Sequence, residues 1–114
     1  MTPHDRLLLR FHMIGATQTE ALDAGRAIAR LLAARCTCSS IEAEPYWKVS
    51  EQHVVRLDLA AGEVRLQELL DLLSPGGWTL RGDGGSWAVW NAAPGVQFAV
   101  EDVAFASLEA LPEA

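Results

Sequence analysis

The stretch RLLLRFHMIGATQTEALDAGRAIARLL, residues 6–32, changes its hydrophobic period at Gly15. Before this glycine every second residue is apolar, which predicts a strand with one fully apolar face over residues 6–14. After it, TQTE has the Thr and Glu spacing of a helix-capping box, and apolar residues recur at helical spacing. We therefore expect a strand followed by a helix over about residues 18–35.

The middle of the chain repeats both periods. Alternating residues predict a hairpin of two strands over residues 41–49 and 54–59, and Pro45 indicates that the first strand lies at a sheet edge. Helical spacing returns from Glu63 to Leu73 and ends at SPGG. This part therefore contributes two strands and a second helix.

The C-terminal third adds a tryptophan-rich hairpin. WTLRGDGGSWAVWN, residues 78–91, predicts two short strands around an Asp-Gly-Gly turn. Residues 96–100 alternate as a further short strand. Residues 101–111 fit a strand or a helix about equally well, and we favour a strand.

The order β-α-β-β-α-β with an added C-terminal hairpin predicts an α+β two-layer sandwich. It is the order of the ferredoxin-like split β-α-β, in which both helices cover one face of an antiparallel sheet. The length fits a single domain spanning residues 1–114. We expect these residues to be buried together: Leu7, Leu9, Phe11, Ile28, Leu31, Leu57, Leu69 and Leu73.

The strand residues that point away from the helices form a second, charged sheet face. Side chains alternate between the two faces of a strand, so this open face follows directly from the predicted core. It contains Arg10, His12, Glu42, Glu44, Tyr46, Lys48, Arg56 and Asp58.

Two registers stay open for the tryptophan hairpin. If Arg81 pairs with Ser86, Trp87 faces the core and Trp90 projects from the other face. A three-residue loop would flip one strand and place Trp90 with Trp78. Under the first register we expect Trp90 to be a binding residue, and core packing of the tryptophans is the alternative.

The charge of the chain is negative and unevenly distributed. The net charge is −6, and residues 36–114 contain four basic and twelve acidic residues. Such a field disfavours nucleic acid and anionic membranes, and it favours association with a basic protein.

The cysteines and the N-terminal sequence indicate a reducing compartment. Cys36 and Cys38 are two positions apart, too close to join distant segments, and we expect both to be free thiols. The apolar start is interrupted by Arg10 and His12 and has no cleavage signal, so it is neither a secretory signal nor a membrane span. We therefore expect a cytoplasmic protein.

The sequence favours neither metal binding nor catalysis. The spacing of the two cysteines with His4, His12 and His53 matches no standard zinc site, so we expect no metal and no cofactor. His12 with Glu42 or Glu44 could form an acid/base pair on the open face. A surface histidine beside solvated carboxylates is the commoner arrangement, and we expect no catalytic residue.

Small size, acidity, an α+β layout and the tail SWAVWN…VQFAVEDVAFASLEAL resemble the immunity proteins of bacterial contact-dependent inhibition and other polymorphic toxin systems. This resemblance implies a protein without chemistry of its own. It would bind a cognate toxin domain, often a basic nuclease, and cover its active site.

Binding of that kind needs fast association and slow release. Clustered carboxylates facing a basic cleft accelerate association, and aromatic anchors slow dissociation. The expected partner-binding residues are Glu42, Glu44, Tyr46, Asp58, Asp83 and Trp90.

The alternative is a ferredoxin-like small-ligand-binding protein or enzyme. It could be dimeric through the open sheet face, with His12 and the tryptophan cluster lining a pocket. A neighbouring gene for a large secreted toxin would separate the two hypotheses.

Overall fold

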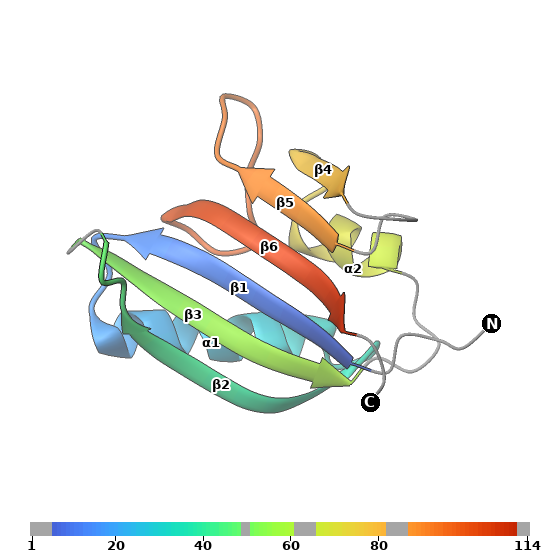
Figure 1. The fold of residues 1–114 in the computed structure, drawn as a ribbon, viewed down its shortest axis with the longest axis horizontal. Helices are drawn as coiled ribbons and strands as arrows, with labels where there is room; N and C mark the ends of the chain where they lie inside the picture. Colours follow the sequence, from blue (N-terminus) through green and yellow to red (C-terminus); the bar gives the residue numbers. More distant parts are fainter. Residues whose placement is uncertain (1–5, 49–50, 61–65, 82–86, 112–114) are drawn as a thin grey trace.

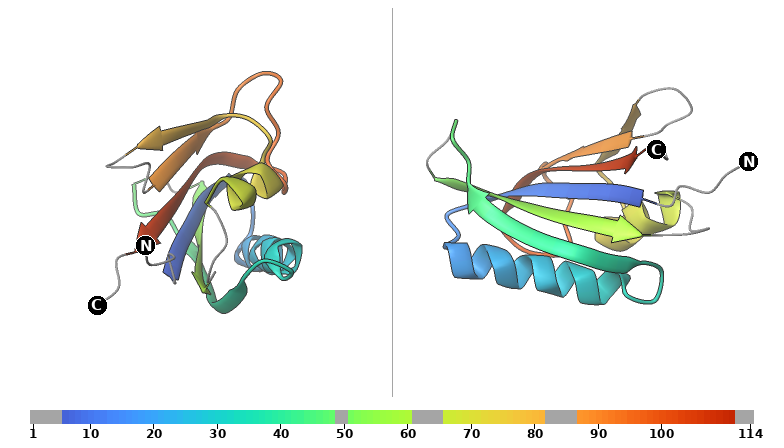
Figure 2. Two further views of the ribbon diagram at one scale, coloured as in Figure 1. Left: turned by 90° about the vertical axis from the view of Figure 1, so that its right-hand side faces the viewer. Right: turned by 60° about the horizontal axis from the view of Figure 1, so that its bottom comes forward.

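The computed structural model describes residues 6–48, 51–60, 66–81 and 87–111, which form six strands and two helices. The strands make one antiparallel sheet of order β2-β3-β1-β6-β5-β4 (Figure 1). Both helices lie on one face of this sheet (Figure 2), so the predicted α+β class is confirmed. The elements are β1 (Arg6–Ile14), α1 (Gln18–Leu32), β2 (Thr37–Pro45), β3 (Gln52–Ala60), α2 (Leu66–Leu73), β4 (Trp78–Arg81), β5 (Trp87–Asn91) and β6 (Val103–Leu111).

The finer expectation of a ferredoxin-like sheet is not confirmed by this order. The β4–β5 hairpin joins the sheet beside β6, so the sheet continues well past the strands of a split β-α-β. The expected edge position of the strand that contains Pro45 is confirmed, because β2 lies at one end of the sheet. The strand at the other end is β4.

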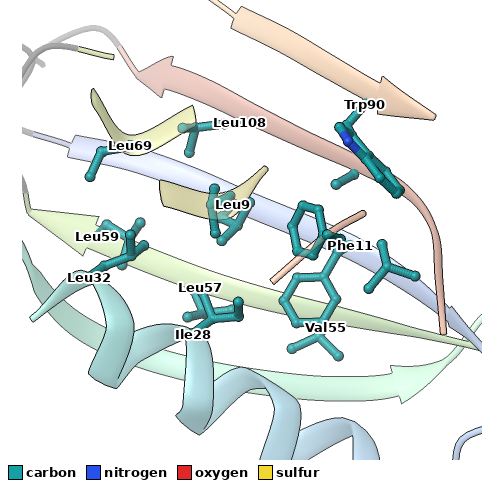
Figure 3. Close-up of a cluster of buried hydrophobic side chains, with 14 of the residues drawn as sticks. Leu9, Phe11, Ile28, Leu32, Val55, Leu57, Leu59, Leu69, Trp90 and Leu108 are labelled. Atoms are coloured by element: carbon teal, nitrogen blue, oxygen red, sulfur yellow. The ribbon is translucent and has the colours of Figure 1, made fainter. Parts of the chain in front are cut away.

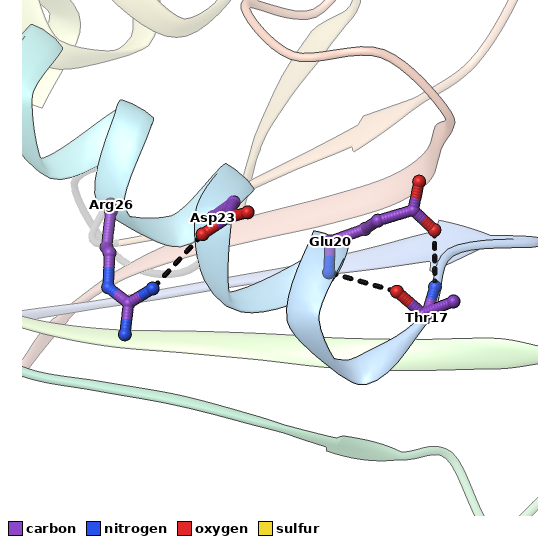
Figure 4. A network of polar contacts seen from close by, with 4 residues as sticks. All are labelled: Thr17, Glu20, Asp23 and Arg26. Atoms are coloured by element: carbon purple, nitrogen blue, oxygen red, sulfur yellow. Dashed lines mark hydrogen bonds and ion pairs between the residues drawn. The ribbon is translucent and has the colours of Figure 1, made fainter.

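The local signals around Gly15 predicted β1 and the start of α1 correctly. The Thr17 hydroxyl accepts a hydrogen bond from the Glu20 amide at 3.1 Å, and Glu20 Oε1 accepts one from the Thr17 amide at 2.9 Å (Figure 4). This reciprocal pair satisfies two amides that the first turn leaves free. The neighbouring Asp23–Arg26 pair at 3.1 Å is exposed and contributes little to stability.

The core forms where β1 lies between β3 and β6. Leu9 of β1 lies opposite Leu57 of β3 and Leu108 of β6, and all three side chains are fully buried (Figure 3). Seven of the eight expected core residues are buried. The expectation for Leu31 is wrong, since it is 40% exposed. The buried stripe of α1 runs through Ile28 to Leu32 instead, where the helix ends.

The expected register of the tryptophan hairpin is also wrong. Trp78 pairs with Trp90 and Arg81 pairs with Trp87, which is the alternative register that places Trp90 with Trp78. Trp90 is only 2% exposed and belongs to the core, whereas Trp87 is 37% exposed. Asp83, in the connection between β4 and β5, lies outside the described residues.

The reason for this register lies at the end of α2. The single N–H of the Trp90 indole is shared between the Ser74 hydroxyl at 3.1 Å and the Gly76 carbonyl at 3.0 Å. The Trp78 indole donates to the carbonyls of Leu70 and Ser74, at 3.0 and 3.1 Å. The Leu70 carbonyl also accepts the Ser74 amide at 2.9 Å, and the later carbonyls at a helix end lack partners within the helix. The two indoles therefore bind α2 and the turn after it to the sheet.

The segment after the hairpin differs from the expectation. Residues 96–100 form no strand. Instead, the Phe98 ring packs in the core, with its centroid 5.1 Å from that of the Trp90 ring and 5.8 Å from that of the Phe11 ring. The ambiguous segment 101–111 contains the strand β6, which confirms the favoured alternative. This strand pairs with β1 and β5 and so fills the middle of the sheet.

Trp90→Ala should destabilise the protein strongly, by about 3–5 kcal/mol, because it leaves a large cavity and removes the indole N–H that Ser74 and Gly76 share. Trp87→Ala is the matched control and should cost about 1 kcal/mol or less, because this side chain is already partly exposed. Urea unfolding of both variants measures the difference. Equal losses would contradict the hairpin register.

Gly25 is the point of closest approach between α1 and the sheet. A Cβ atom there would lie 2.7 Å from Cγ2 of Ile41 and 3.0 Å from Cγ1 of Val55. Helix propensity alone favours Gly25→Ala by about 1 kcal/mol, whereas overpacking costs about 1–3 kcal/mol. We therefore expect Gly25→Ala to lower the free energy of unfolding. Gly76→Ala, which meets open space, should leave it nearly unchanged in the same urea series.

Candidate functional site

The face of the sheet opposite the helices carries a hollow of about 630 Å³ over β2, β3, β1 and β6. We call it the open-face hollow. Four charged side chains and four rings line most of it: Arg10, Arg56, Glu42, Glu44, His12, Tyr46, Trp47 and Phe105.

The strand register brings these side chains together in rows across the sheet. In one row His12 of β1 lies between Val54 of β3 and Phe105 of β6. In the next row Arg10 lies between Arg56 and Ser107. The edge strand β2 continues both rows, because Glu44 lies opposite Val54 and Glu42 lies opposite Arg56.

His12 is the centre of an aromatic cluster. Its ring meets the rings of Tyr46 and Phe105 edge to face, with centroids 4.8 and 5.5 Å away. Its Nδ1 lies 3.3 Å from Oε1 of Gln52, and the acid/base pair with a glutamate does not form in the described residues. Burial lowers the pKa of His12, the hydrogen bond with Gln52 opposes this, and the charge of Arg10 lowers it further. The lowered pKa favours the neutral form of the ring at pH 7.

Two arginines occupy the middle of the open-face hollow. Arg10 and Arg56 lie directly opposite each other on neighbouring strands, and both are exposed. Among the described residues neither has a carboxylate oxygen within 4.0 Å. Like charges directly opposite on neighbouring strands repel each other, and Glu42, opposite Arg56 on β2, offsets part of this repulsion.

Trp47 is the most exposed large apolar side chain among the described residues, at 83%. The alternating pattern placed it on the core side, but β2 ends at Pro45 and the next residues leave the strand. Its ring lies 6.3 Å from that of Tyr46, and Nζ of Lys48 lies 5.0 Å from its centroid. The protein thus presents a tryptophan to solvent at the rim of the hollow.

The structure brings together only part of the expected partner-binding set. Glu42, Glu44 and Tyr46 line the hollow. Asp58 lies on the same face but outside the hollow, and its carboxylate accepts a hydrogen bond from the Ser40 hydroxyl at 2.7 Å. The placement of Trp90 on this face is wrong, because it is buried on the helix side.

The cysteines and histidines do not converge. The thiols of Cys36 and Cys38 donate to the carbonyls of Leu32 and Ser40, and burial raises the pKa of both. Both cysteines are free. Residues 6–48, 51–60, 66–81 and 87–111 contain no group of three or more metal-binding side chains, and His4 lies outside these ranges.

Neither described helix has the length and apolar character needed to cross a membrane.

The chain was compared with protein-family models, curated proteins and solved structures, and none of them matches it. The role of the open-face hollow must therefore follow from its own residues. They combine arginine, glutamate and exposed aromatic rings, a composition that suits binding of another molecule.

His12 should titrate below its ordinary pKa of 6.5 in an NMR titration of the ring protons. Arg10→Gln should move this pKa upward by removing a nearby positive charge, whereas Arg26→Gln on α1 should not.

The lowered pKa of His12 should also make the stability of the protein depend on pH. Because His12 holds a proton less tightly in the folded protein than in the unfolded chain, the free energy of unfolding should fall as pH decreases from about 6.5 through the folded-state pKa. His12→Gln should flatten this part of the stability curve. A pKa above 6.5 would contradict the description of the cluster.

Proposed function

We propose that this protein is an immunity protein that binds a cognate toxin domain through its open sheet face and covers the active site of that domain. It acts in the cytoplasm by binding alone, without a cofactor. The observation that carries this proposal is the exposure of Trp47 at the rim of the open-face hollow. An exposed tryptophan contributes little to the core of a free protein, whereas tryptophan, tyrosine and arginine dominate binding hot spots.

The surface around the hollow supports an interface of protein size. A stable complex buries about 800 Å² on each partner, more than one hollow supplies. The open face continues across β6 to β5, where Trp87 lies opposite Glu109 and Val89 opposite Ser107. A toxin domain seated over the hollow would therefore also contact β5.

The net charge of the chain and the charges inside the hollow have different roles in binding. The whole chain carries a net charge of −6, which favours encounter with a basic domain. The hollow itself carries two arginines and two glutamates, so its charges are balanced. Neighbouring opposite charges of this kind select the partner and its orientation, while the net charge increases the rate of association.

A second candidate is a ferredoxin-like small-ligand-binding protein or enzyme, possibly dimeric through the open face. The volume of the hollow, about 630 Å³, falls within the range of small-molecule sites. The position of β3 between β1 and β2 supports a ferredoxin-like core extended by β4 and β5. The partly buried, neutral His12 beside two arginines favours an anionic ligand in this case.

Co-expression with a toxin domain from a neighbouring gene tests the proposal. The wild-type protein should restore growth, and Trp47→Ala should weaken binding to the purified toxin domain by roughly 30-fold, or about 2 kcal/mol. Trp47→Ala should leave the free energy of unfolding almost unchanged, because the side chain is exposed.

Leu31→Ala is the control, because this exposed apolar side chain lies on α1, on the opposite side of the sheet. It should retain both binding and protection. Growth that the wild-type protein does not restore would exclude the immunity function. Equal loss of binding in both variants would exclude the open face as the contact surface.

A further inference from the structure

We infer that the open-face hollow binds a carboxylate between Arg10 and Arg56, and that the toxin domain supplies it on a side chain beside an apolar or aromatic group. This inference rests on the proposed function, because it names the chemistry that the partner presents to the hollow. It concerns the two arginines and the rings next to them.

Arg10 and Arg56 are placed to bind a carboxylate, and their N–H donors are not paired with a carboxylate among the described residues. Their backbones lie directly opposite each other on β1 and β3, and both side chains line the hollow. A guanidinium presents parallel N–H donors that match the two oxygens of a carboxylate. An anion held between Arg10 and Arg56 would offset their mutual repulsion. It would also supply the carboxylate that the described residues do not place within 4.0 Å.

The charges of the open-face hollow are distributed asymmetrically, because both glutamates lie on the edge strand β2. Glu42 lies opposite Arg56 in the register, and Glu44 follows on the same side of the edge strand. The negative charges therefore lie toward the edge of the sheet, and the positive charges lie over β3 and β1. A partner whose carboxylate occupies the middle would bring any neighbouring lysine or arginine toward β2. A basic domain can thus present one acidic side chain here.

The rings indicate what is attached to the carboxylate. His12, Tyr46 and Phe105 form a continuous aromatic wall beside the arginines, and Val54 lies in the same row. These rings would exclude water from one side of a bound carboxylate, which strengthens the charge pairing. They also favour a carboxylate with an apolar body over a strongly hydrated inorganic anion.

Phenylacetate is a suitable probe, because it combines a carboxylate with a ring. In an NMR titration of the labelled protein at pH 7 and constant ionic strength, it should shift the amide signals of Arg10, Arg56 and Ser107 saturably. We expect a dissociation constant in the millimolar range, as befits a ligand of this size. Phenylacetamide, which lacks the charge, and acetate, which lacks the ring, should each bind about tenfold more weakly.

Arg10→Gln and Arg56→Gln should each weaken phenylacetate binding about tenfold. Arg56→Lys keeps the charge but removes the fork of donors, so it should also weaken binding while preserving the fold. Arg81→Gln on β4 is the control, because this arginine is exposed and lies outside the hollow. It should bind phenylacetate like the wild type.

Three results would overturn the inference: equal shifts with sodium chloride, equal binding of phenylacetamide, or an equal loss in Arg81→Gln. If one of these occurs while Trp47→Ala still loses toxin binding, the carboxylate assignment is wrong and the immunity function stands. If phenylacetate binds as expected but the wild-type protein does not neutralise the toxin domain, the partner is wrong and the hollow is a site for a small organic acid.

Discussion

The alternation of side chains along β1 connects the core of this protein with its surface. Leu9 and Phe11 point toward the helices, and Arg10 and His12, which alternate with them, point to the open face. Because β1 pairs with β3 on one side and β6 on the other, it fixes the rows of residues on both faces. A shift of one residue would exchange the two faces, so burial of the leucines also holds the arginines in place.

The sequence predicted those elements whose signals are local. The alternation of β1 and the capping box at Thr17 need no information from elsewhere in the chain, and both predictions are confirmed. The register of the tryptophan hairpin was predicted wrongly, because its deciding contacts come from another element. Trp90 is held by hydrogen-bond acceptors in Ser74 and Gly76, which follow α2. The sequence of the turn between β4 and β5 does not indicate these acceptors.

The candidate site was predictable to a similar extent. Glu42 and Tyr46 followed from strand alternation, and the structure places both in the hollow. Phe105 could not be predicted, because its segment fitted a strand or a helix equally well. Alternation continued past Pro45 would place Trp47 on the helix side of the sheet, whereas the strand ends at Pro45. Sequence periodicity therefore identified the face of the sheet, but not the aromatic residues that complete its hollow.

The pairing of β1 with β6 has a consequence for how the protein emerges from the ribosome. The ladder joins Arg6 with Leu111, across nearly the whole chain, so the centre of the sheet closes only after β6 has been synthesised. Until then β1, α1, β2 and β3 can assemble, but the leucine-rich β1 is left as an unpaired edge that can recruit other chains. Contacts over such long sequence separations also form slowly. Solubility during synthesis therefore depends on the time between the synthesis of β1 and its pairing with β6.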